Sequence, residues 1–138
     1  MKTAGYSGTP LHKKLGIKTG ASVRLINAPG EYTEWLGSDC PSFTSAKENE
    51  MAIDFVHIFT NSADELAAFL ASLKNQIHPD GMVWVSWYKK SAKKHTEVTE
   101  NLIRDIALPL GWVDIKVCAV SDDWSGLKLV ITVKQRVI

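Results

Sequence analysis

The residues with the clearest chemical potential form a basic loop after an apolar segment. Residues 82–87 read Met-Val-Trp-Val-Ser-Trp, and Lys89, Lys90 and Ser91 follow, with two further lysines directly after them. A helix amino terminus is expected soon after, near residues 96–97, and such termini attract anions, as do the carboxyl ends of parallel strands. Lys89, Lys90 and Ser91 are therefore candidate binding residues for a small anion such as phosphate. The alternative is a solvated basic loop.

A second candidate is the turn Asp122-Asp-Trp-Ser-Gly126. Trp124 and Ser125 are candidate ligand-binding residues here, because an apolar ring left in water at a turn often marks a contact with a ligand or partner. The alternative is that Trp124 folds back on the sheet edge. Asp122 and Asp123 are expected to neutralise lysines of the 89–94 segment if the two loops meet.

Other reaction chemistries lack the residues that they need. The four histidines do not pair at helical spacing, and neither cysteine adjoins one, so no metal site is predicted. The sequence contains no nucleophile elbow and no Walker phosphate loop. His57 lies within an apolar segment and is interpreted as a hydrogen-bonded histidine of the sheet. We therefore predict no catalytic residues and no cofactor, and favour a protein that is not an enzyme.

Composition sets the scale of the fold. The 138 residues, 45% of them hydrophobic, suit one domain, with residues 1–20 as an N-terminal arm and short helix. A net charge of +1, from 16 basic and 15 acidic side chains, gives no bulk attraction to nucleic acid or to a membrane. No apolar leader and no membrane-length segment is present, and the two cysteines suit free thiols, so we expect a cytoplasmic protein.

The elements that must position these loops are read from hydrophobic periodicity. Residues 54–59 and 82–87 are expected to be parallel strands, joined by a helix from Ser62 to Ile77 and a Pro-Asp-Gly turn at 79–81. Ser62 and Glu65 fit a capping box at the start of that helix. Three more elements are expected at the segments 9–16 (helix), 23–27 (strand) and about 97–108 (helix).

The last segments alternate with period two. Val113, Ile115, Val117 and Ala119 alternate with polar residues or cysteine, and the stretch from Leu127 to Val133 behaves similarly. The connector at 121–126 is too short for a crossover helix, so these strands must form an antiparallel hairpin. The predicted fold is a Rossmann-like three-layer α/β domain, mostly parallel with an antiparallel C-terminal hairpin.

This element order resembles the class I, S-adenosylmethionine-dependent methyltransferases. The segment from Leu73 to Val85 is similar to that family's "helix, L-x-P-G-G, strand" segment, and Leu15 to Ile26 is similar to the approach to its first strand. The resemblance covers roughly residues 15–36 and 54–134. It implies a glycine-rich cofactor loop after the first strand and a ribose-binding acid at the end of the second.

The whole chain more closely resembles a family of short, uncharacterised bacterial proteins of unknown function. The shared features are Gly5-Tyr-Ser-Gly-Thr-Pro-Leu11, Lys89-Lys90, the stretch from Leu108 to Val120, and Trp124-Ser-Gly-Leu127. This second resemblance implies a fold and no activity.

Two departures from the methyltransferase pattern stand out. The turn after the first strand is Asn27-Ala-Pro-Gly30, in which Pro29 lacks an amide and the glycine-rich approach is missing. Only 27 residues run from 28 to 54, and a single crossover takes about 30, so the second and third strands are expected to be shortened or absent.

Three functions remain open from the sequence. The leading hypothesis is a non-catalytic, methyltransferase-like domain that binds a small anionic ligand or a protein partner. The first alternative is a small S-adenosylmethionine-dependent transferase with an atypical cofactor loop. The second is a nucleic-acid-binding module using Lys13, Lys14 and the 89–94 lysines, which the charge balance disfavours. Two tryptophans on one strand, Trp84 and Trp87, also suggest a homodimer interface, unless one lies under each helix layer.

Overall fold

A six-stranded sheet in the order β2-β1-β3-β4-β6-β5 runs through the structure, a computed structural model that describes residues 9–132. The strands β1 to β4 are parallel, and β6 and β5 are antiparallel additions beside β4. The predicted single α/β domain, mostly parallel with an antiparallel C-terminal hairpin, is confirmed. The strands are β1 (Ser22–Ile26), β2 (Thr44–Ser45), β3 (Ile53–Phe59), β4 (Ile77–Tyr88), β5 (Trp112–Ala119) and β6 (Trp124–Ile131).

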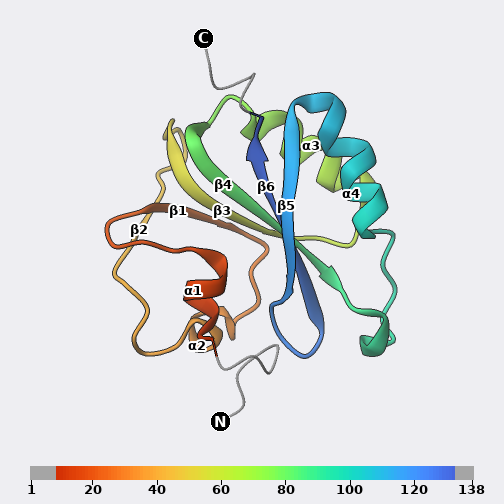
Figure 1. Cartoon of the computed structure of the whole chain (residues 1–138), viewed down its shortest axis with the longest axis horizontal. Coiled ribbons are helices and arrows are strands. Elements are labelled where there is room, and N and C mark those ends of the chain that lie inside the picture. The colour runs from red at the N-terminus through yellow and green to blue at the C-terminus, as the bar shows by residue number, and fades with distance from the viewer. Residues whose placement is uncertain (1–8, 133–138) are drawn as a thin grey trace.

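Helices cover both faces of this sheet. Figure 1 shows α1 and α2 on one side and α3 and α4 on the other. Within residues 9–132 no helix is both long enough and apolar enough to cross a bilayer. The helices are α1 (Leu11–Leu15), α2 (Tyr32–Leu36), α3 (Ala63–Leu73) and α4 (Glu100–Ala107), with short 3₁₀ turns η2 (Lys90–Ala92) and η3 (Leu108–Leu110).

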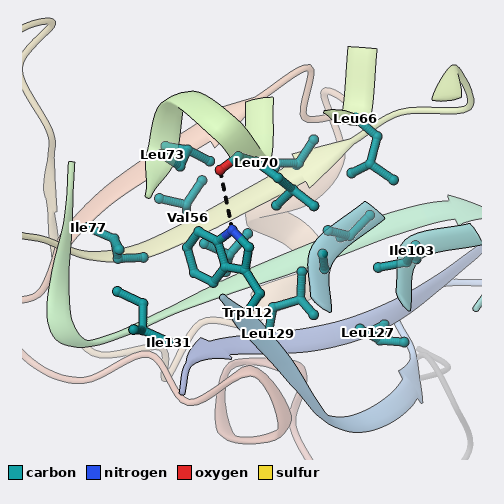
Figure 2. Close-up of a cluster of buried hydrophobic side chains, with 14 of the residues drawn as sticks. Val56, Leu66, Leu70, Leu73, Ile77, Ile103, Trp112, Leu127, Leu129 and Ile131 are labelled. Atoms are coloured by element: carbon teal, nitrogen blue, oxygen red, sulfur yellow. Dashed lines mark hydrogen bonds between the residues drawn. The ribbon is translucent and has the colours of Figure 1, made fainter. Parts of the chain in front are cut away.

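The core between the sheet and α3 and α4 is centred on Trp112. Figure 2 shows its indole surrounded by aliphatic side chains of the helices and strands. The ring is fully buried, and its Nε1 donates a hydrogen bond to the Leu70 carbonyl at 3.3 Å. Burial of an aromatic ring this large gives one of the larger contributions to stability. The polar atom of the ring is satisfied by a helix carbonyl, so the ring adds apolar contact without an unpaired group.

The two tryptophans of β4 point to opposite faces of the sheet. Trp87 belongs to the core under α3 and α4, whereas Trp84 belongs to the core under α1 and α2 and donates its Nε1–H to the Leu15 carbonyl at 2.8 Å. Trp84 is 0% exposed and Trp87 is 7% exposed. One indole lies under each helix layer, so neither is available to a partner. A homodimer stays a prediction that these two residues do not support.

The start of α3 confirms half of the expected capping box. The Ser62 hydroxyl accepts from the Glu65 amide at 3.3 Å, as predicted. The Glu65 carboxylate does not return to the Ser62 amide. It accepts from the Thr60 hydroxyl at 2.7 Å, and that hydroxyl oxygen accepts from the Ser62 amide at 3.2 Å. Thr60 therefore serves as a relay that the pattern did not reveal.

The predicted end of this helix is wrong. Helix α3 ends at Leu73, and Ile77 belongs to β4, where it pairs with Ile53. The next pair is Phe55 with Met82, so β4 has four residues where β3 has one, and the Pro-Asp-Gly segment is a large bulge within the strand. The Ile53 amide donates to the Gln76 carbonyl at 3.0 Å, which fixes the strand start ahead of the bulge.

Because Gly81 is tightly packed within this bulge, a single methyl group added there should lower the stability of the fold. A Cβ on Gly81 would lie 2.7 Å from Cγ1 of Ile77 and 2.9 Å from the Ile53 carbonyl oxygen. Gly81→Ala is therefore expected to lower the free energy of unfolding by about 1–3 kcal/mol, measured by chemical denaturation. The control is Gly30→Ala, because nothing lies within 4 Å of a Cβ there. Equal stability of the two variants would contradict the packing described for the bulge.

Strand β5 departs from its expected alternation. Asp114 pairs with Leu129 and Lys116 with Lys128, so Ile115 is an extra residue that shifts the phase of the strand. As a result Ile115 is 54% exposed and Val117 is 43% exposed, although both were expected on the apolar face. The expected strand residues Val133 and Lys134, and the expected irregular arm at 1–8, lie outside the described part of the chain.

The middle segment is as short as predicted. Strand β2 has two residues and pairs only with Ser22 and Val23 at the start of β1. Between Ser45 and Ile53 no further strand is formed, and the segment before β2 contains only α2 and irregular chain. The expectation that the second and third strands are shortened or absent is confirmed for the described residues.

Candidate functional site

A hollow of about 390 Å³ lies at the carboxyl edge of the sheet. Three segments line it: the bend after β1 with α2, the end of β4 with the loop that follows, and the turn between β5 and β6. This is the edge at which open α/β sheets bind ligands. The lining residues are Pro29, Glu31, Trp35, Tyr88, Lys94, Ser121, Asp122, Asp123 and Trp124.

Aromatic rings form one wall of the hollow. The Tyr88 and Trp124 ring centroids lie 4.5 Å apart, and Trp124 meets the buried Phe59 edge-on at 5.0 Å. The Trp35 ring lies 6.4 Å from the same Phe59 ring, centroid to centroid. Trp124 is half-buried, so the interpretation that it folds back on the sheet edge is confirmed. Its remaining exposed surface faces the hollow.

The two predicted loops do converge. The Lys89 amide donates to the Asp123 carbonyl at 2.9 Å, and Nζ of Lys94 lies 3.5 Å from Oδ2 of Asp123. Both side chains of that ion pair are about half exposed, so it contributes at most about 1 kcal/mol to stability. The contact holds the hairpin turn against the end of β4 and closes one side of the hollow.

The structure separates the predicted ligand-binding residues. Only Trp124 lines the hollow. Lys90 and Ser91 are exposed on η2, and Lys89 is half-buried beside the hairpin. Ser125 follows Trp124 on a strand and therefore points to the opposite face of the sheet. Whether the four other residues bind a ligand stays a prediction.

The helix terminus expected near residues 96–97 lies further along the chain. Helix α4 begins at Glu100, and the Thr99 hydroxyl accepts from the Leu102 amide at 3.1 Å. Glu97 serves another helix, because its carboxylate accepts from the Ala63 amide at the start of α3 at 2.8 Å. Both helix amino termini thus have protein acceptors, and Glu100 places a carboxylate in the first turn of α4.

A buried chain of three polar side chains ties α2 to the sheet beneath the hollow. The Tyr32 hydroxyl lies 2.9 Å from Nδ1 of His57, and Nε2 of His57 lies 2.8 Å from the Ser86 hydroxyl. The His57 and Phe59 rings are stacked with centroids 4.3 Å apart. His57 is therefore the satisfied sheet histidine that the sequence predicts, and it does not reach the hollow.

Burial decides the protonation of this chain. His57 is 0% exposed, and desolvation lowers its pKa from 6.5 to about 3. Desolvation also raises the pKa of Tyr32 far above its ordinary value. At neutral pH the imidazole is uncharged, so one ring nitrogen donates and the other accepts. It is the desolvation, rather than the hydrogen bonds to Tyr32 and Ser86, that keeps the imidazole uncharged.

The depressed pKa predicts acid destabilisation. Because the unfolded chain takes up a proton near pH 6.5 and the folded chain does not, stability is complete above that pH and falls as the pH drops toward 3. Each pH unit in the window is worth up to about 1.4 kcal/mol. Denaturation between pH 7 and 4.5 measures the slope, above the range in which most carboxylates titrate.

His57→Gln removes the titrating group and should flatten this pH dependence, whereas exposed His95→Gln should leave it unchanged. An NMR titration gives a second readout, in which the His57 ring signal should not shift between pH 7 and 4.5. A normal imidazole titration in that window would contradict the buried neutral state.

The bend after β1 lacks the features of a glycine-rich cofactor loop. Asn27 adopts a φ of 59°, Ala28 packs against the core under α2, and Pro29 has no amide to donate. Helix α2 then runs for only five residues, and Tyr32 and Leu36 are buried. This bend offers a ligand the Glu31 carboxylate and the Trp35 ring.

Glu50 and Asp54, two of the acids that follow β2, lie at the opposite edge of the sheet, where both accept hydrogen bonds from Ser22. Strand β2 reaches only Val23, and the chain then returns to start β3. The Glu50 carboxylate accepts from the Ser22 hydroxyl at the start of β1, and Arg24 holds the carbonyls of Lys47 and Glu48. No acid of β2 or the following residues 46–52 thus reaches the carboxyl edge.

A second hollow, of about 320 Å³, lies at the amino ends of the strands. Among its lining residues, Asp54 accepts from the Ser22 amide at 2.9 Å at the start of β1, and His78 Nδ1 accepts from the Asp80 amide at 2.9 Å within the β4 bulge. Across residues 9–132, no group of three or more histidine, cysteine or acidic side chains has the spacing to hold a metal ion.

Comparison with known proteins finds solved structures of similar fold, but no related sequence. No protein-family profile and no curated protein matches the sequence. Among solved structures, the chain resembles a TehB-like S-adenosylmethionine-dependent methyltransferase from Corynebacterium glutamicum (TM-score 0.55, 10% identity, covering 93% of this chain and 90% of that one). It also resembles a putative type 11 methyltransferase from Sulfolobus solfataricus (TM-score 0.52, 20% identity, covering 87% and 88%).

A third neighbour is the 1,6-didemethyltoxoflavin N1-methyltransferase of Burkholderia thailandensis, solved with its substrate and S-adenosylhomocysteine (TM-score 0.58, 15% identity, covering 88% and 75%). The domain therefore has a methyltransferase-like Rossmann fold. At these identities the likeness shows the fold alone.

Sequence reasoning missed part of the lining. Glu31, Trp35 and Tyr88 line the hollow but are not among the candidate ligand-binding residues that the sequence predicts. A tryptophan within a short polar segment directly after the first strand was the available signal. Nothing in the sequence showed that Tyr32 would meet His57 and Ser86, because that contact joins three separate elements.

Proposed function

We propose that this chain is a non-catalytic binding domain built on the methyltransferase fold, with its ligand in the hollow at the carboxyl edge. The observation that carries the proposal is the early end of β2 at Ser45, beside Val23. In the family that this fold resembles, the second strand delivers the ribose-binding acid to the ligand edge. Here β2 pairs with β1 through only two residues before the chain turns back. No acid of this strand therefore reaches the ligand edge.

The bend after β1 supports the same function. A glycine-rich loop lets backbone amides approach a cofactor, and Pro29 removes one such amide. Helix α2 is fixed by the contact between Tyr32 and His57, which holds the bend against the sheet. The hollow itself lies farther along the edge, between this bend and the β5–β6 turn, and its size falls within the roughly 300–1,000 Å³ of small-molecule sites.

A small transferase is the second candidate. It is favoured by the position of the hollow, which touches both the bend after β1 and the end of β4. Glu31 is the carboxylate available there for a sugar hydroxyl, and Trp35 is a surface for a flat ring. An anion at Lys89, Lys90 and Ser91 is a further proposal, which the following measurement addresses. A protein partner over the same edge is another.

The proposal predicts no response to the methyl-transfer cofactors. At millimolar S-adenosylmethionine or S-adenosylhomocysteine, the melting temperature of the protein should not change, whereas a conventional class I methyltransferase measured alongside should be stabilised. Calorimetry with inorganic phosphate and mononucleotides tests the anion at the 89–94 loop in the same experiment. Saturable binding of S-adenosylhomocysteine would replace the binding domain with the transferase, and salt-sensitive DNA or RNA binding would favour the nucleic-acid module.

A further inference from the structure

The hollow at the carboxyl edge already holds a cation that belongs to the chain. Nζ of Lys94 lies 5.2 Å from the centroid of the Tyr88 ring and 3.5 Å from Oδ2 of Asp123. An ammonium within about 6 Å of an aromatic face is attracted by the ring quadrupole. The Lys94 side chain is 53% exposed, so the ammonium reaches this position from an exposed loop residue rather than from a packed one. The hollow therefore provides the contacts that an ammonium ion seeks.

The charge of the lining is not balanced by that one lysine. Glu31 and Asp123 contribute two carboxylates against the single ammonium of Lys94. Within residues 9–132 the Glu31 carboxylate forms no ion pair. Concave surfaces that carry one sign of charge concentrate ions of the other sign. This lining favours a cation over an anion, although the exposed Lys90 and Lys93 lie close by in sequence.

The walls suit an organic cation rather than a metal ion. Trp35, Tyr88 and Trp124 line the hollow, and the Tyr88 and Trp124 rings are tilted by 40° to each other. Alkyl groups next to a positive nitrogen pack against such rings, whereas a bare metal ion requires converging oxygen ligands. No convergent set of ligands exists in the described residues.

We propose that this hollow binds a small organic ammonium ion, such as a protonated or N-methylated amine. Its alkyl groups pack on Tyr88 and Trp124, and its charge faces the Glu31 carboxylate. This inference rests on the proposed function and names its ligand class. The ion takes the place of the Lys94 ammonium over Tyr88 or lies directly beside it, so Lys94 competes with the ligand.

Choline is a suitable probe, with its uncharged isostere 3,3-dimethylbutan-1-ol as the matched control. The readout is the set of tryptophan indole signals in a two-dimensional NMR spectrum, since the chain has five tryptophans. The signals of Trp35 and Trp124 should shift saturably with choline. Those of Trp84 and Trp112, which are buried and bonded to carbonyls of other segments, should not. The isostere should bind at least about fivefold more weakly.

Three variants sharpen the test. Glu31→Gln should weaken choline binding about two- to fivefold, because it removes one carboxylate from the lining. Glu34→Gln, on the same helix but not in the lining, should leave binding unchanged. Lys94→Met should strengthen binding about two- to fivefold, because it removes the competing ammonium. A site for an anion would lose affinity with this last variant.

Equal binding of choline and its isostere would overturn the inference, as would weaker binding to the Lys94→Met variant. Shifts of the Trp35 and Trp124 signals by inorganic phosphate alone would also overturn it, as would no response to choline at tens of millimolar. These failures are distinct from failure of the proposed function, which is decided by the response to S-adenosylhomocysteine. A protein that binds neither compound keeps the proposed function and loses only this ligand class.

Discussion

The carboxyl edge of the sheet, where the hollow lies, depends on the buried imidazole of His57, which stays uncharged at neutral pH. His57 lies in the middle of β3 and joins Tyr32 of α2 to Ser86 of β4 through its two ring nitrogens. A five-residue helix is marginal on its own, so α2 owes its place to this buried chain and to the apolar contacts of Tyr32 and Leu36. Because α2 carries Trp35 and follows Glu31, the position of one wall of the hollow follows from the neutral histidine.

The short connection between β1 and β3 determines which side chains lie at the carboxyl edge of the sheet. The connection leaves β2 after two residues, and its acids then hold the beginning of β1 instead of reaching the other end of the sheet. The hollow at the carboxyl edge is lined by the bend after β1 with α2, by the end of β4 with the loop that follows, and by the β5–β6 turn. The C-terminal hairpin therefore lines part of the hollow, and no acid from β2 takes part in it.

The sequence predicts the elements better than their junctions. The capping serine and the apolar stripe define α3, and the short connector at 121–126 leaves an antiparallel hairpin as the sole option. The helix end is misjudged because Ile77 fits the helical spacing of Leu66 to Leu73 and equally fits a strand paired with Ile53. The alternation on β5 fails at Ile115 because a bulge depends on the partner strand. The site is predicted only in part, since its rings and acids meet through three separate connections.

Strand β2 covers only the first half of β1. In a parallel pair, alternate residues direct both backbone groups to the same neighbour, and Val23 directs its carbonyl to Ala46 of the β2 side. The backbone groups of Leu25 point the same way, beyond the end of β2, and its side chain is 37% exposed. Strand β1 lies between β2 and β3 in the sheet, but the second half of its β2 side has no partner strand among the described residues. Water therefore hydrates the backbone groups on that side. Amide hydrogen exchange along β1 should alternate between fast and slow as a result.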